Sequence, residues 1–531
     1  MRSACAIASL RRWALLGLLG LGGGLESALL AQDVPPPAPP ATAEEGDVVP
    51  APEPVMTTPA PAAKPAAPKP PPQPWKLTFF DNDFSYKKDP NHTPLLGENL
   101  KEIPLDEIFP SDVLSDTTIS WGGELRFRYM DERNRLRPQG DTRRNMYDLW
   151  RWRNYLDVKH SDWARVYVEM IDASIFHNDL PPTGIDLNRW DLLNYFVDIA
   201  PLEIDDQKIW IRTGQQELNY GSQRLVSPLD WANTRRNFEG FKVFTKGEAW
   251  DLDAWVTNPV NTATPNDGPL ARFANTFDSR NQDRVFTGAW ATYKGVKDHT
   301  FDSYFLWDHT SQNNAGGPNL AAYPLGNRYL TATRWLGNYA YSGDGVLHGE
   351  VEGGYQFGND HGRRVNAGFV TVGAGHTWKS LPWEPKLWFY YDWASGDGDP
   401  DAGNTNSTFF QYFGLVHAYL GLIDNIARQN ISDVNWKFTV KPHKKVTFLT
   451  AQHFFSKANS NDYLYNVTGA RIGAPNTGSD IGQELDLVAT YNHNQNFSVE
   501  AGYFWFWYGA VFDTMPRDTA QQFYLQTTFR Y

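Results

Sequence analysis

The chain has 531 residues, of which 15% are aromatic and 43 are glycine, a composition typical of a protein with many strands and turns. Its only cysteine, Cys5, lies at the very start, so a processed chain would contain no disulfide framework and no cysteine-based metal site. The mean hydropathy of −0.51 and the lack of long apolar runs exclude helical membrane spans, whereas a barrel stays possible because its strands are only half apolar.

Residues 1–31 predict a secretory signal peptide. Arg2, Arg11 and Arg12 give it a positive start, WALLGLLGLGGGL supplies an apolar core, and small residues precede a cleavage point before Gln32. A single membrane anchor is the alternative, but the apolar run is short and diluted by glycine.

The next two segments differ in composition. Residues 32–74 consist mostly of proline and alanine with scattered charge, which favours extended polyproline II and cannot bury a core. We therefore expect a disordered linker there, able to tie the chain to periplasmic export or cell-wall partners through residues 33–74. Residues 75–116 are expected to form a periplasmic segment that leads into the barrel.

From residue 117 onward, apolar and charged residues alternate with a period of two. In ISWGGELRFRY, the positions of Trp121, Leu125 and Phe127 are apolar, while Arg126 and Arg128 fall on the opposite face. The pattern recurs in LWRWRNYLDVK and VNWKFTVK. A soluble sandwich would show the same alternation, so the period alone does not separate it from a membrane barrel.

The connection lengths do separate them. We predict eighteen strands at 118–130, 148–159, 163–175, 190–200, 208–217, 237–246, 249–258, 284–294, 299–309, 328–338, 346–357, 365–378, 386–394, 431–441, 445–456, 483–493, 497–508 and 521–531. Long loops alternate with brief turns, which is how outer-membrane barrels are built. Residues 409–421 could be taken for another strand, but one strand there would break this alternation, so we place them in a long loop. Residues 117–531 are thus expected to form one transmembrane antiparallel barrel.

The segment GQQELNYGSQRLVSPLDWANTRRNFEG resembles a signature of the alginate export porins, which are eighteen-stranded outer-membrane barrels. WGGELRFRY, SGDGDPDAGNTNSTFFQYF and ELDLVATYNHNQNFSVEAGYFWFWYGAVF extend the resemblance over the barrel, and the aromatic C-terminus resembles the signal that directs such barrels to insertion. The resemblance implies a channel in the outer membrane of a Gram-negative-type cell. It also implies a basic lumen that suits an anionic polysaccharide such as alginate, or its oligosaccharide fragments.

Ten basic residues are candidates for contact with such a solute. They are Arg126, Arg128, Arg151, Arg153, Arg165, Lys208, Arg212, Arg224, Arg235 and Arg236. Guanidinium groups in a narrow aqueous passage attract carboxylates and can bind them with two hydrogen bonds. Alternatively, these basic groups form structural ladders across neighbouring strands with the carboxylates of Glu124, Asp157, Glu169 and Glu217. The net charge of −13 means that any anion preference has to come from the placement of these residues.

Two other groups of residues suggest chemistry. Asp397, Asp399 and Asp401 could ligate a structural Ca²⁺ through hard oxygens, although the spacing lacks the remaining ligands of an EF-hand and a solvated loop is the simpler interpretation. His309 and Ser311 could suggest an outer-membrane hydrolase, but no orienting acid or oxyanion hole accompanies them. We expect no enzyme and no other cofactor. Nucleic-acid binding has no support because the basic residues are dispersed.

Three function classes remain. The first is a passive channel for an anionic polysaccharide in contact with outer-membrane lipid. The second is a general diffusion porin whose N-terminal extension tethers it to the periplasm or cell wall, and the third is an outer-membrane enzyme.

Overall fold

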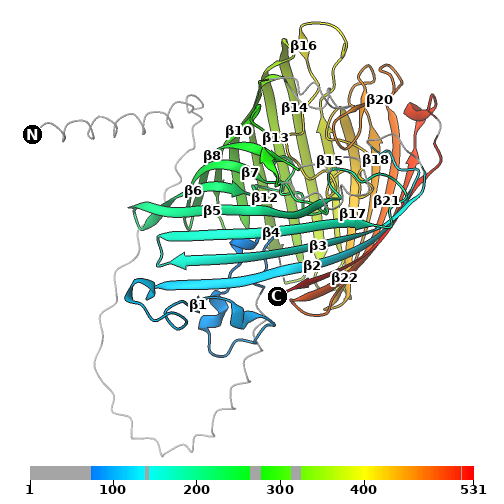
Figure 1. The fold of residues 1–531 in the computed structure, drawn as a ribbon. Coiled ribbons are helices and arrows are strands. Elements are labelled where there is room, and N and C mark those ends of the chain that lie inside the picture. Colours follow the sequence, from blue (N-terminus) through cyan, green and yellow to red (C-terminus); the bar gives the residue numbers. More distant parts are fainter. Residues whose placement is uncertain (1–72, 138–142, 263–276, 312–324, 342, 516) are drawn as a thin grey trace, which may run out of the picture. The chain divides into compact units, whose positions relative to one another are not determined.

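The computed structural model describes residues 73–137, 143–262, 277–311, 325–341, 343–515 and 517–531, which fall within one compact unit. In this part of the chain, eighteen long antiparallel strands form one closed barrel (Figure 1). The barrel closes where the first long strand pairs with the last, so that Glu124 lies opposite Arg530. No helix among these residues has the length and apolar character that a membrane span requires. The predicted signal peptide and nearly all of the predicted linker lie outside the described residues.

The barrel strands follow one another around the wall in chain order. They are β2 (Thr117–Arg133), β3 (Asn145–His160), β4 (Ala164–Phe176), β5 (Asn188–Ile204), β6 (Gln207–Gln216), β7 (Phe238–Lys246), β8 (Trp250–Asn261), β10 (Arg284–Tyr293), β11 (His299–Thr310), β12 (Gly326–Tyr341), β13 (Gly345–Asp360), β14 (Arg363–Trp378), β15 (Lys386–Ala394), β17 (Ile431–His443), β18 (Val446–Ser456), β21 (Asp480–Asn492), β22 (Phe497–Tyr508) and β23 (Ala520–Arg530). The eighteen predicted strands are confirmed, and the largest difference is at the end of β5, which runs on to Ile204 instead of residue 200.

Shorter elements accompany the eighteen long strands. They are the two-residue strands β1 (Ile103–Pro104), β9 (Ser279–Arg280), β16 (Thr405–Asn406), β19 (Leu464–Tyr465) and β20 (Arg471–Ile472), and the 3₁₀ turns η1 (Phe79–Asp81), η2 (Ser85–Lys88), η3 (Glu98–Leu100), η4 (Asp112–Leu114) and η6 (Ala510–Phe512). Residues 409–421 contain no strand and lie in the connection between β15 and β17, as predicted.

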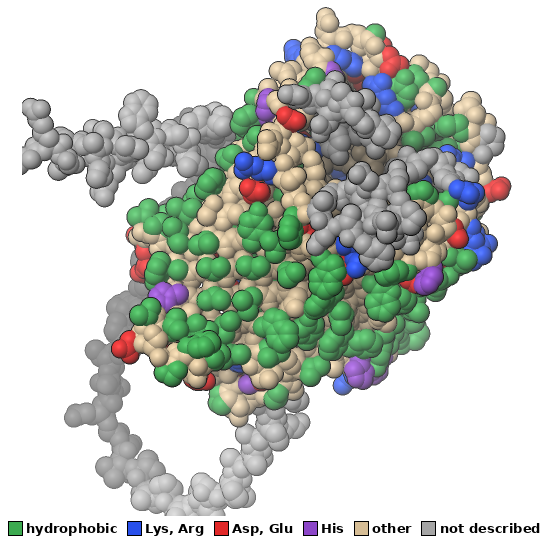
Figure 2. All heavy atoms as spheres, in the orientation of Figure 1, with side chains coloured by type: hydrophobic (Ala, Val, Ile, Leu, Met, Phe, Trp, Pro, Cys, Tyr) green, Lys and Arg blue, Asp and Glu red, His purple; other side chains and the backbone are tan. Residues whose placement is uncertain are grey.

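The two faces of each strand meet different surroundings. On β2, the side chains of Trp121 and Leu125 are 44% and 47% exposed, whereas those of Glu124 and Arg126 are 2% and 4% exposed. Apolar side chains cover the outer wall in Figure 2, and charged side chains gather toward its edges. This inverted burial is what a membrane barrel needs, because its outer face meets lipid and its inner face can hold charge. The prediction of a membrane barrel over a soluble sandwich is confirmed.

The connections sort onto two rims. One rim, here called the short-turn rim, carries brief turns such as 161–163 and 444–445, and the other, the long-loop rim, carries connections such as 217–237 and 395–430. One connection on the long-loop rim departs from the predicted rhythm, because β13 and β14 are joined by only residues 361–362. The neighbouring connection between β15 and β17 packs beside this short turn, because its strand β16 pairs with the start of β14.

Two of the long connections fold into the barrel. We call residues 217–237 the first infolded loop and residues 395–430 the second infolded loop. Val226 of the first forms a parallel bridge with Phe413 of the second, and the Phe413 amide donates to the Leu225 carbonyl at 2.9 Å. The Phe413 ring also packs 4.8 Å from that of Phe286 on β10. The largest apolar core among the described residues therefore lies inside the barrel, between the infolded loops and the wall.

The segment before β2 also packs against the inside of the wall. We call residues 75–101 the N-terminal strap. Phe79 and Phe80 form a buried cluster with Tyr155 of β3, Tyr167 of β4 and Phe196 of β5. These three wall residues share the inward faces of their strands, so this part of the strap lies in the lumen. The predicted lead-in segment thus includes residues that enter the barrel.

Candidate functional site

The inward basic residues of β2 and β3 hold the first infolded loop. Arg126 donates to the backbone carbonyls of Asp230 and Ala232 at 2.8 and 2.6 Å. Arg128 donates to the Trp231 carbonyl at 2.8 Å, and its guanidinium lies 3.7 Å from the centre of the Trp231 ring. Because residues two apart on a strand point the same way, Arg126 and Arg128 reach adjacent positions of one loop. Their predicted place inside the barrel agrees with the structure.

Arg151 on β3 joins the same group through carboxylates. Its Nη2 lies 2.6 Å from Glu124 Oε1 and 2.8 Å from Asp230 Oδ1. Arg235 also forms an ion pair with Asp230. Burial alone would raise the pKa of the Asp230 carboxyl, but Arg151, Arg235 and Arg126 outweigh it and hold the pKa well below its ordinary value. The surrounding guanidinium groups therefore stabilise the charged form of Asp230.

Three further inward arginines form ion pairs with neighbouring strands. Arg153 pairs with Glu169 at 2.6 Å. Arg165 and Arg212 each bind one carboxylate with two hydrogen bonds, to Asp157 at 2.7 and 2.9 Å and to Asp198 at 2.7 and 2.8 Å. These are the ladders that the alternative interpretation of the sequence predicted for Asp157 and Glu169.

The remaining predicted residues lie in the first infolded loop or at the rim. Arg224 reaches across the lumen to Glu350 at 2.6 Å and Glu352 at 3.0 Å on β13. Arg235 pairs with Glu217, and Arg236 donates to the Phe413 carbonyl. Lys208 pairs with Asp162 in a turn of the short-turn rim, so it stands apart from the lumen group.

Arg126 and Arg128, both on β2, keep a charge that no described carboxylate neutralises directly. Across the described ranges, Arg126 and Arg128 form no ion pair, and all their acceptors are neutral oxygens. The Nε of Arg126 is buried and has no hydrogen-bond acceptor among the same residues. A guanidinium group that is held in place but not neutralised can still attract an anion.

The opposite wall is rich in inward carboxylates that the sequence analysis did not single out. These are Asp302, Asp308, Glu350, Glu352, Asp360, Asp392, Asp433, Glu484 and Asp486. Some bind the second infolded loop, since Arg428 pairs with Asp392 at 2.7 Å and Glu484 accepts the Ile423 amide at 2.8 Å. The alternation in the sequence could have placed pairs such as Glu350 and Glu352 on one face of a strand. Only the closed barrel shows which basic residues lie opposite them.

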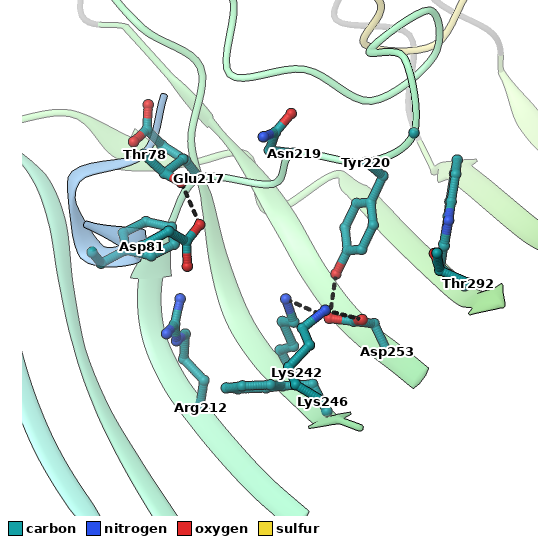
Figure 3. A pocket seen from close by; sticks show the side chains of 14 residues that line it. Thr78, Asp81, Arg212, Glu217, Asn219, Tyr220, Lys242, Lys246, Asp253 and Thr292 are labelled. Carbon is teal, nitrogen blue, oxygen red and sulfur yellow. Dashed lines mark hydrogen bonds and ion pairs between the residues drawn. The ribbon is translucent and has the colours of Figure 1, made fainter. Parts of the chain in front are cut away.

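A pocket of about 180 Å³ lies between the strap and the wall of β6, β7, β8 and β10 (Figure 3). Asp253 lines this pocket, where it accepts hydrogen bonds from Tyr220 at 3.0 Å and Lys246 at 2.9 Å and pairs with Lys242 at 2.7 Å. The other charged residues that line the pocket are Arg212 of β6, Glu217 of the first infolded loop and Asp81 of the strap. The three cations and three carboxylates balance formally, so this pocket suits a polar solute without selecting its sign.

The residues that suggested other chemistry have separate partners. Asp397 pairs with Arg363 at 2.7 Å, and Asp401 pairs with Arg471 at 2.9 Å. No group of three or more candidate metal ligands is found among the described residues. The Ser311 hydroxyl donates to the Asp283 carbonyl, while His309 lies 3.0 Å from the Asn327 side chain, so neither contact within the described ranges would activate the serine.

Comparison with known proteins gives the same class of molecule. Residues 117–525 match the family described as alginate export. OccD3 (OpdP) of Pseudomonas aeruginosa is 11% identical with a TM-score of 0.50, and the alignment covers 77% of this chain and 91% of that one. OccAB3 of Acinetobacter baumannii is 8% identical with a TM-score of 0.50, covering 78% and 99%. OpdQ of Pseudomonas aeruginosa is 12% identical with a TM-score of 0.50, covering 78% and 97%. A search of curated proteins finds no match.

Proposed function

This chain belongs to the alginate export family and is an outer-membrane channel, and we propose that it carries an anionic polysaccharide such as alginate, or its oligosaccharide fragments, by passive transport. The family supports the class of solute. The observation that supports the mechanism is the pair of inward guanidinium groups, Arg126 and Arg128, whose hydrogen-bond acceptors are all neutral.

The physical basis is attraction without tight binding. A uronate residue presents a carboxylate that a guanidinium group can bind with two hydrogen bonds, and the effect is strong where low-dielectric walls confine the field. Conduction also requires that the solute leaves again. Arg151 and Arg235 share Asp230, so their attraction is weakened, and Arg126 and Arg128 supply the remaining preference for an anion.

The proposed orientation follows from the rims. In outer-membrane barrels the short turns face the periplasm and the long loops face outward. We therefore place the short-turn rim, the strap and the N-terminal extension on the periplasmic side, where residues 33–74 can meet export or cell-wall partners. The solute follows its own gradient. No catalytic activity, cofactor or nucleic-acid partner belongs to the proposal, and the aspartates at 397, 399 and 401 act as loop residues.

A general diffusion porin is the second candidate. It is favoured by the ion pairs of Arg151, Arg153, Arg165, Arg212 and Arg224, which are structural ladders in that case. The balanced lining of the pocket beside the strap is also compatible with neutral solutes.

Block of single channels by a tetrauronate distinguishes the two candidates. Arg126→Gln together with Arg128→Gln should weaken the block about tenfold, which corresponds to about 1.4 kcal/mol. The matched control is Arg284→Gln with Asp308→Asn, which removes an inward pair joined at 2.6 Å and leaves the lumen charge unchanged. Equal block in all three proteins, or equal block by a neutral tetrasaccharide, would support the general porin instead.

A further inference from the structure

The strap occupies the same wall as the candidate solute residues. The Phe79 ring lies 3.9 Å from the guanidinium carbon of Arg153, and the Phe80 ring lies 4.6 Å from that of Arg212. The Phe80 ring also packs 5.3 Å from Phe196. Two bulky apolar side chains thus cover basic groups that would otherwise face the aqueous lumen, and both rings are nearly fully buried.

Backbone carbonyls of the strap bind further arginines. Arg165 donates to the Phe80 carbonyl at 2.7 Å, and Arg235 of the first infolded loop donates to the Leu77 carbonyl at 3.1 Å. The strap backbone is itself folded there, because the amides of Asp81 and Asp83 donate to the carbonyls of Thr78 and Pro74 at 3.0 and 3.1 Å. The backbone of residues 77–83 is therefore folded on itself and is not a simple extended chain.

Lys101 fastens the other end of the strap. Its amino group donates to the backbone oxygens of Trp121 on β2 and of Tyr531, the latter at 3.0 Å, where the barrel closes. The same amino group lies 5.4 Å from the Trp75 ring, 5.6 Å from the Phe84 ring and 5.3 Å from the Tyr155 ring. One buried lysine side chain thus connects both ends of the strap to the wall.

The contacts between the strap and the barrel wall can be released and formed again. Within the described residues, no ion pair joins residues 75–84 to the barrel, so removing this segment leaves Arg153, Arg165 and Arg212 with their carboxylate partners. The pocket beside the strap has Thr78, Phe80 and Asp81 on one side. Displacement of these residues would widen that pocket and uncover Arg153, Arg165 and Arg212.

We propose that residues 75–84, held by Lys101, are an autoinhibitory plug that narrows the lumen at the short-turn rim and leaves its seat when the channel conducts fully. The plug competes with solute for the wall of β3 to β6. This regulation does not depend on which solute the channel carries, because the seated plug restricts small ions and polysaccharides alike.

The test measures single-channel conductance of the full chain in potassium chloride. Phe79→Ala with Phe80→Ala should raise the mean conductance at least threefold. The matched control, Phe109→Ala with Val113→Ala, removes two apolar side chains that are 62% and 78% exposed in the same N-terminal region, and it should conduct as the wild type does. Hydrogen exchange at the amides of Asp81 and Asp83 should be slow in the wild type and in the control, and fast in the plug variant.

A second variant covers the case in which the double substitution fails to insert. Lys101→Met removes the ammonium that joins the strap to the wall without changing a barrel strand, and it should also raise the conductance. Wild-type conductance in every inserted variant, or free-peptide exchange at Asp81 and Asp83 in the wild type, overturns the proposal. If these variants raise the conductance as expected but oligouronates do not block the channel, the result would instead count against the proposed solute alone.

Discussion

The infolded loops and the N-terminal strap both fill the lumen, but they are held by different forces. The loops are tied to the wall by buried charge pairs, such as Arg224 with Glu350 and Arg428 with Asp392, and to each other by backbone hydrogen bonds. The strap contributes aromatic rings and neutral carbonyls. Removing one partner of a buried ion pair leaves the other charge without compensation. Moving an aromatic ring away from an arginine that keeps its carboxylate partner leaves no uncompensated charge. The loops are therefore a fixed constriction and the strap is a removable one.

The largest expected effect comes from removing the charge that fixes the loops. Arg224→Met leaves Glu350 and Glu352 facing each other without a shared cation, which should cost roughly 3–5 kcal/mol of stability. The midpoint of heat-induced barrel unfolding should fall and the conductance should become larger and noisier. Adding Glu352→Gln should recover most of the loss, because Glu350 keeps its pair with Arg334. A midpoint equal to that of the wild type would mean that the loops are not held by charge.

A smaller effect is expected where a loop covers a candidate solute residue. The Trp231 ring lies over the Arg128 guanidinium and stacks 3.8 Å from the His417 ring. Trp231→Ala uncovers Arg128, so block by a tetrauronate should strengthen by a few-fold, in line with the roughly 0.5–2 kcal/mol of a cation–π contact. Trp150→Ala is the matched control because its side chain is 51% exposed on the outer face. Weaker block in the Trp231 variant would show that the loop, and not Arg128, recognises the solute.

The smallest expected effect is a pH dependence of the strap. Burial, with a contribution from Lys87, lowers the pKa of Lys101 to about 7. When the strap is released, the pKa of Lys101 returns toward its ordinary value of about 10.4. Between pH 7 and this value the released state therefore binds more protons than the seated state, so the strap binds its seat more strongly as the pH rises. Mean conductance should fall modestly from pH 6 to pH 8.

Lys101→Met should remove this dependence. The other charged group near Lys101 in the strap, Lys87, donates to the Lys101 carbonyl and stays in both proteins. A wild-type conductance that rises over the same pH range would contradict the assignment of Lys101 as the latch.

Much of the barrel could be predicted from the sequence. The period of two placed Trp121 and Leu125 on one face and Arg126 and Arg128 on the other, because side-chain direction alternates along any strand. The rhythm of long and short connections separated a barrel from a sandwich, and it kept residues 409–421 out of the wall.

The contents of the lumen could not be predicted in the same way. Glu350 lies 126 residues after Arg224 in the chain, and their contact depends on closure of the barrel and on a loop that turns inward. Neither feature leaves a periodic pattern in the sequence. The strap gave no signal either, since Phe79 and Phe80 form a single apolar pair with no repeat. The charges of the basic residues were visible from the sequence, but their partners required the fold.

The measurement that tests the account most directly is the reversal potential in a potassium chloride gradient. We expect the wild type to prefer chloride, because Arg126 and Arg128 keep charges that no described carboxylate pairs with. Arg126→Gln with Arg128→Gln should shift the reversal potential toward that of potassium, while the charge-neutral control, Arg284→Gln with Asp308→Asn, should leave it in place. An unchanged reversal potential in a correctly folded Arg126 and Arg128 variant would contradict the account and leave a general porin with structural arginines.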